Sequence, residues 1–175
     1  MKKVILFAAF AVVAFATQAQ TEKSTWLLGG SAGFSSSKTG DFKTTSFSFA
    51  PNAGYFVMDN LAVGAGIGFQ SQKDEGDDAV SLFSANPFVR YYFTKLGENA
   101  KLFGNANFGV GSAKSGGDSQ SFTQWGIAAG PAIFLNKNTA LEMTVGYSSV
   151  KVKDAVDATG TFGVNVGFQI HFGGK

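Results

Sequence analysis

Arg90, Glu142 and His171 are the residues whose types could do chemistry within the patterned part of this chain. His171 is the only histidine, and a lone histidine does not make a metal site or a nucleophilic pair. Arg90 and Glu142 carry opposite charges, and a buried charge is costly unless it is partnered. We therefore predict an Arg90–Glu142 ion pair that stabilises an interior, with His171 as an interior or rim residue.

Neutral polar residues recur on the same face of their segments as these two charges. They predict a polar plug that surrounds the ion pair, and its expected members are Asn105, Gln124, Asn165, Gln169 and His171. A gated or proton-responsive pore is the alternative interpretation of the same residues. Nothing in the pattern predicts a catalytic residue, a bound metal or a cofactor.

Extended segments must position these side chains, and the clearest segment is Leu61–Phe69. Its odd-numbered residues are apolar, and its even-numbered residues are alanine or glycine. Alternation with a period of two predicts a strand whose two faces meet different environments. The glycine run at 64–68 resembles a nucleotide fingerprint, but no helix follows it. It instead predicts space for large inward side chains, for which the candidates are Phe56, Phe88, Tyr92, Phe103 and Phe122.

Seven further segments repeat this alternation, and turn residues separate them. Besides the strand that starts at Leu61, we predict strands at Ser24–Ser36, Lys43–Val57, Val80–Phe93, Lys101–Ala113, Gln120–Leu135, Thr139–Lys153 and Gly160–Phe172. Formal charges lie almost entirely in the connections, and only 15% of residues are charged. A strand exterior without charge suits lipid, so the apolar face is expected in the bilayer and the neutral polar face inside.

The pattern therefore predicts an all-β fold, an eight-stranded antiparallel up-and-down transmembrane β-barrel. Its sheet must close, because lipid offers no partner to an unpaired backbone group. Aromatic residues near the strand ends are expected to form interfacial girdles: Trp26, Tyr55, Tyr91, Phe93, Phe134 and Phe172.

The N-terminus predicts a signal peptide over residues 1–19 and a barrel domain over residues 20–175. Lys2 and Lys3 precede an apolar run that ends at Ala16, and small residues follow. We expect cleavage after Ala19, with cleavage after Ala16 as the alternative. Two of the 14 basic residues would leave with this segment, so 12 basic and 12 acidic residues would remain. A neutral chain gives no electrostatic basis for nucleic-acid binding, and a chain without cysteine has no lipid-anchor thiol.

The connections alternate in kind, which predicts an orientation. Met58–Asn60 and Asn136–Asn138 are short, whereas Ser37–Phe42 and Lys73–Ala79 are longer and more polar. Short turns of such barrels lie in the periplasm and longer loops lie outside. Both termini are therefore expected in the periplasm of a Gram-negative bacterium.

Three stretches resemble the small outer-membrane β-barrel family of the OmpX and OmpA-transmembrane-domain type. They are GYFVMDNLAVGAGIGF (Gly54–Phe69), NPFVRYYF (Asn86–Phe93) and GVNVGFQIHF (Gly163–Phe172). The resemblance implies an eight-stranded barrel that the outer-membrane assembly machinery inserts by reading a C-terminal aromatic residue. Phe172 matches that residue, although Gly173, Gly174 and Lys175 follow it.

We expect a non-enzymatic, porin-like protein of the cell envelope with a structural, envelope-integrity or surface-interaction role. A narrow channel for small solutes or ions is the alternative, and a lipid-modifying enzyme is less supported because no nucleophile cluster marks the outer rim. The expected partners are outer-membrane lipids, lipopolysaccharide and the assembly machinery, and the barrel is expected to be monomeric.

Overall fold

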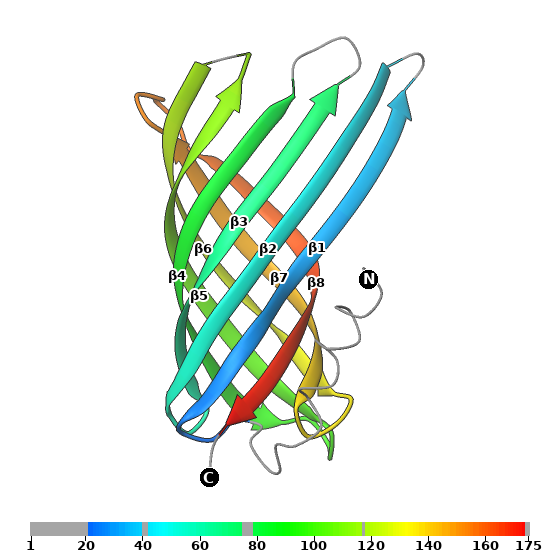
Figure 1. Cartoon of the computed structure of the whole chain (residues 1–175), viewed down its shortest axis with the longest axis vertical. Helices are drawn as coiled ribbons and strands as arrows, with labels where there is room; N and C mark the ends of the chain where they lie inside the picture. Colours follow the sequence, from blue (N-terminus) through cyan, green and yellow to red (C-terminus); the bar gives the residue numbers. More distant parts are fainter. Residues whose placement is uncertain (1–20, 40–41, 75–78, 117, 174–175) are drawn as a thin grey trace, which may run out of the picture.

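Eight long strands make up the part of the chain that the computed structural model describes, which is residues 21–39, 42–74, 79–116 and 118–173 (Figure 1). The expected signal peptide lies outside these residues. The strands are β1 (Thr25–Thr39), β2 (Phe42–Met58), β3 (Leu61–Asp74), β4 (Val80–Lys95), β5 (Ala100–Ser115), β6 (Asp118–Phe134), β7 (Thr139–Val152) and β8 (Thr159–Gly173). No helix in these residues is long and apolar enough to cross a membrane.

Each strand pairs antiparallel with the next, and β1 pairs with β8 to close a barrel. This topology confirms the predicted eight-stranded antiparallel up-and-down barrel. Several strands run further than predicted into the polar connections. β3, for example, continues to Asp74, whose carboxylate accepts a 2.6 Å hydrogen bond from the Thr44 hydroxyl on β2. Polar residues there remain in the sheet because cross-strand pairing continues through them.

The outward and inward faces of the sheet carry the side chains that the alternation predicts for them. Large apolar side chains point outward and stay exposed, among them Leu28, Ile67 and Val145. The five large aromatic residues predicted to point inward are all buried: Phe56, Phe88, Tyr92, Phe103 and Phe122. These two observations show a barrel with an apolar exterior and an interior filled by side chains.

The two ends of the barrel differ, and we call them the turn end and the loop end. The turn end carries the connections β2–β3, β4–β5 and β6–β7, together with Thr21 and Gly173. Thr21 is buried there, where its hydroxyl donates a 2.7 Å hydrogen bond to Asn60 Oδ1. The Lys101 ammonium donates a 2.5 Å hydrogen bond to the same hydroxyl. The segment that precedes β1 therefore ties β5 to the β2–β3 turn. The loop end carries the other four connections.

Gly64 on β3 shows why small residues alternate with apolar ones. An added Cβ at Gly64 would lie 2.5 Å from Phe88 Cζ and 2.6 Å from Gly54 Cα. The Phe88 ring therefore occupies space that two glycines leave open. This arrangement confirms the predicted role of the glycine run at Gly64, whereas a Cβ added at Gly66 or Gly68 would lie nearest to Pro51 or Ser84.

We expect Gly64→Ala to lower the free energy of unfolding by about 1–3 kcal/mol, because overpacking must displace Phe88 or the neighbouring backbone. Gly163→Ala is the matched control, since nothing lies within 4 Å of a Cβ added there. Denaturant unfolding of both variants in detergent micelles, followed by tryptophan fluorescence, measures the difference. Equal midpoints for the two variants would contradict the packing argument.

Candidate functional site

A buried ion pair joins opposite walls of the barrel. Arg90 on β4 and Glu142 on β7 lie 52 positions apart in sequence, and Arg90 Nη1 donates to both carboxylate oxygens at 2.8 and 3.0 Å. The two residues are only 7% and 4% exposed. The predicted Arg90–Glu142 ion pair is therefore confirmed.

Neighbouring strands complete the hydrogen bonds of this pair. Asn105, which is opposite Arg90 in the β4–β5 register, accepts a 3.3 Å hydrogen bond from Arg90 Nε. The Tyr92 hydroxyl donates to Glu142 Oε1 at 3.3 Å. Tyr92 follows Arg90 by two positions, so alternation places both on the inward face. The alternation predicts Tyr92 as a large inward side chain, but it gives no signal for the bond to Glu142.

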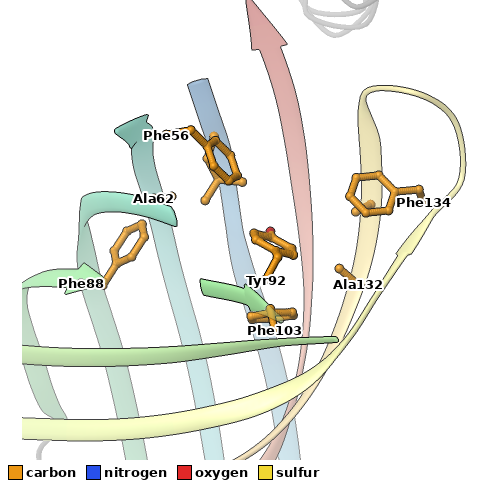
Figure 2. Close-up of a cluster of buried hydrophobic side chains, with 9 residues drawn as sticks. Phe56, Ala62, Phe88, Tyr92, Phe103, Ala132 and Phe134 are labelled. Atoms are coloured by element: carbon orange, nitrogen blue, oxygen red, sulfur yellow. The ribbon is translucent and has the colours of Figure 1, made fainter. Parts of the chain in front are cut away.

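Several buried aromatic rings gather inside the barrel (Figure 2), and two of them contact the Arg90 guanidinium. The Arg90 guanidinium lies 4.5 Å from the Phe103 ring centroid and 5.7 Å from that of Phe88. Such contacts favour a desolvated cation. The Tyr92 ring lies 5.4 Å from Phe103 and 5.8 Å from Phe56. We call Arg90, Glu142, Tyr92 and the buried rings around them the plug.

His171 belongs to this aromatic layer. Its ring lies 5.8 Å from Phe56, 6.1 Å from Tyr92 and 5.3 Å from Phe134, and its residue is fully buried. Its backbone N–H donates to Asn138 O, and Asn138 Nδ2 donates to His171 O. His171 is thus packed within the described barrel among three rings near the turn end, in accord with its predicted interior position.

The neutral polar residues that were predicted to surround the ion pair lie at different depths in the barrel. Gln169 is buried beside the ion pair, whereas Gln124 bonds to Asn86 and Ser84 in a separate layer nearer the loop end. Asn165 lines the same interior but is exposed. Asn86 and Ser84 were not among the predicted site residues, although the alternation places both on the inward face of their segment.

Five of the six predicted girdle aromatics lie on the outer face. Trp26 pairs with both Tyr55 and Phe172 across neighbouring strands, and its ring lies 5.1 Å from that of Tyr55. Tyr91 and Phe93 form a second edge-to-face contact at 5.2 Å. These residues form an aromatic group near the turn end.

Phe134 does not belong to that girdle, and its prediction was wrong. It is only 6% exposed and packs against His171 inside the barrel. The physical reason is parity, because Ile133 and Leu135 on either side of it point outward. Alternation within its own segment would have placed it inside, and its position near a strand end was misleading.

A cavity of about 230 Å³ lies between the plug and the Gln124 layer. Its polar lining consists of Arg90 and Glu142 with uncharged amide and hydroxyl side chains, chiefly Asn52, Asn86, Asn105, Asn107, Gln124, Thr144, Asn165 and Gln169. The two charges compensate each other, so the lining is neutral overall. Within the described ranges, no group of three histidine, cysteine, aspartate or glutamate residues could hold a metal ion.

A sequence model of the outer membrane protein beta-barrel domain matches residues 5–169. The chain belongs to this family. Several solved structures share its fold, including the two that follow. The crystal structure of Neisserial surface protein A (NspA) is 19% identical with a TM-score of 0.57, and 85% of this chain and 96% of that chain are covered. No curated protein matches the chain in sequence.

The second structure is the N-terminal β-barrel domain of OprF from Pseudomonas aeruginosa. It is 15% identical with a TM-score of 0.54, and 87% of this chain and 100% of that chain are covered. At these identities the likeness shows the fold alone. Family membership and the exposed apolar face together identify a transmembrane barrel of the outer membrane.

We expect Arg90→Met to lower the free energy of unfolding by about 3–5 kcal/mol, because Glu142 would remain buried without its cation. The double substitution Arg90→Met/Glu142→Leu should recover most of that loss, since it removes both charges. Denaturant midpoints of the wild type, both single variants and the double variant complete the cycle. Additive effects of the two substitutions would show that the pair is not coupled.

Proposed function

We propose that this protein is a non-enzymatic, monomeric structural barrel of the outer membrane that supports envelope integrity or surface interaction. The plug is the observation that carries this proposal. Arg90, Glu142, Tyr92 and the rings around them fill the lumen towards the turn end. An eight-stranded barrel has little room beyond its own side chains, so a filled cross-section supports a closed barrel.

The proposed orientation places the turn end in the periplasm and the loop end outside the cell. Short turns in the periplasm are typical of such barrels. The proposed partners are lipopolysaccharide and other outer-membrane lipids along the apolar face, and the outer-membrane assembly machinery during insertion. Phe172, exposed on the last strand and paired with Trp26, is the proposed recognition residue for that machinery.

A narrow channel for small solutes or ions is the second candidate function. The neutral polar cavity beside the plug favours it, because Arg90, Glu142 and Phe103 of the plug line that cavity. Conduction would require displacement of the plug aromatics. Bilayer recordings therefore discriminate the two candidates.

Wild-type protein in planar lipid bilayers is expected to show no sustained conductance. Phe103→Ala should produce stable open events, because it removes the ring that packs on both Arg90 and Tyr92. Phe108→Ala is the matched control on the same strand, since Phe108 is exposed on the outer face. A gel shift on boiling verifies that each variant is folded. Large, steady conductance of the wild type would overturn the closed-barrel proposal.

Two exposed residues of the connections test the orientation in a chain that has no cysteine. Glu98 lies in a turn-end connection, and Val156 lies in a loop-end connection. In intact cells, a membrane-impermeant maleimide should label Val156→Cys and not Glu98→Cys. Both variants should react after lysis. Preferential labelling of Glu98→Cys in intact cells would reverse the proposed orientation.

The envelope role itself is tested by deletion of the gene. Loss of the barrel is expected to increase killing by detergent, and the wild-type gene should restore resistance. Complementation by the folded Phe103→Ala variant shows which property matters. Restored resistance would mean that the presence of the barrel is sufficient, and lack of resistance would mean that its lumen must be closed. Unchanged sensitivity of the deletion strain to detergent and antibiotics would contradict an envelope-integrity role.

A further inference from the structure

A groove of about 620 Å³ lies on the outer face of the barrel, across the loop-end parts of β4, β5, β6 and β7. It shares no lining residue with the interior cavity. Most of its lining residues have the outward parity of their strands, and Phe83 and Val110 among them are 52% and 56% exposed. The outward lining residues are Phe83, Ala85, Val110, Ser112, Ser121, Thr123, Lys151 and Lys153.

Strand register arranges these outward residues in two parallel rows across the four strands. The first row contains Phe83, Ser112, Ser121 and Lys153, and the second contains Ala85, Val110, Thr123 and Lys151. The Lys153 N–H donates a 2.8 Å hydrogen bond to Ser121 O, so β7 is still held to β6 at this point. Along both rows, the side chains change from apolar on β4, through hydroxyl on β6, to cationic on β7.

The tilt of the strands turns this order of side chains into a gradient of depth. Trp26 on β1 pairs with Phe172 on β8. The register row that leaves Trp26 in the other direction, through β2 to β7, reaches β8 at Phe162. Phe162 lies nearer than Phe172 to the loop end, so each row rises towards the loop end from β1 to β8. The β7 lysines are therefore the groove residues nearest the loop end, and Phe83 and Ala85 lie farther from it.

The groove crosses the loop-end boundary of the apolar band. On β7 the outward residues are apolar as far as Tyr147 and polar from Ser149 onwards. The Trp125 and Tyr147 rings lie 5.6 Å apart at this boundary, and aromatic residues mark the membrane interfaces of such barrels. The β7 lysines thus lie at the level of lipid head groups, whereas the β4 end of the groove lies within the apolar band.

Positive charge predominates at the loop-end edge of the groove. Lys151 and Lys153 share one face of β7 and are both exposed, so their like charges repel each other. Asp154 also lines the groove, and its carboxylate compensates for one of these cations. Lys114, the next outward residue after Ser112 on β5, adds a further exposed cation beside the groove. This excess of positive charge fits an anionic head group.

We propose that this groove binds the lipid A part of lipopolysaccharide, a phosphorylated disaccharide that carries several acyl chains. Lys151 and Lys153 bind a phosphate, the Ser121 and Thr123 hydroxyls face the sugar, and an acyl chain packs against Phe83. The order of cation, hydroxyl and apolar side chain matches the order of phosphate, sugar and acyl chain in that lipid. The inference rests on the proposed function, because the proposed orientation places the loop end in the leaflet that contains lipopolysaccharide.

The test measures equilibrium binding of bisphosphorylated lipid A to the purified full-length barrel in detergent micelles. Lys151→Gln/Lys153→Gln should weaken binding roughly tenfold, because two cations beside the phosphate are lost. Lys23→Gln/Lys137→Gln is the matched control, since it removes two exposed lysines at the turn end. A gel shift on boiling verifies that each variant is folded. Equal affinities of the two double variants would overturn the site.

Removal of the phosphates identifies the group that the lysines contact. Lipid A without phosphate should bind the wild type roughly tenfold more weakly, and Lys151→Gln/Lys153→Gln should then cause no further loss. Independent losses from the two changes would overturn the contact between the lysines and the phosphate.

A bulky side chain at the β4 end tests the acyl-chain contact. Ala85→Trp should weaken binding of lipid A, because the indole would occupy the apolar end of the groove. Ala129→Trp is the matched control, since Ala129 is an exposed outward residue of β6 that does not line the groove. Equal binding by these two variants would overturn the proposed place of the acyl chain.

Phosphatidylglycerol tests whether the ligand is lipid A or another anionic lipid. It should compete weakly, because it has one phosphate and no disaccharide, and competition equal to that of lipid A would overturn the assignment. All of these measurements use micelles, so they depend neither on the orientation in cells nor on the detergent sensitivity of the deletion strain. A failure of the groove to bind lipid A is therefore distinguishable from a failure of the proposed function.

Discussion

The enclosed Arg90–Glu142 ion pair is the interaction on which the interior depends. Two ions removed from water are costly, and the cost is offset only where geometry and further hydrogen bonds are good. Here two carboxylate contacts from Nη1, the Asn105 amide and the Tyr92 hydroxyl meet that condition. Because the pair spans from β4 to β7, it also fixes how opposite walls face each other.

The aromatic packing follows from that pair. Phe103 and Phe88 cover the guanidinium, and Tyr92 links the carboxylate to the ring layer that contains Phe56 and His171. Large rings fit within a narrow barrel only where neighbouring positions lack side chains. Gly64, which pairs with Phe88 between β3 and β4, provides such a place for the Phe88 ring. The Arg90–Glu142 ion pair, the aromatic rings and Gly64 therefore pack as one arrangement. A substitution in any of the three affects the packing of the others.

Alternation was sufficient to predict the barrel, because each residue's parity decides whether it meets lipid or lumen. The ion pair was predictable for the same reason, since Arg90 and Glu142 share the inward face and a similar depth. Phe134 was misplaced because position along the strand was given more weight than parity. The link between Tyr92 and Glu142 depends on side-chain direction across the lumen, which one strand's pattern does not contain.

The incomplete seam could not be predicted, because closure was inferred from the rule that lipid-exposed backbone must be paired. That rule does not give the register of the seam, and β1 pairs with β8 from Thr25 to Gly30 in the described strands. The barrel is therefore filled and closed differently along its axis. Towards the turn end, paired strands and large side chains exclude solvent. Towards the loop end, the pairing ends at Gly30, which adopts φ 148°, and polar side chains that line a cavity take the place of the packed rings.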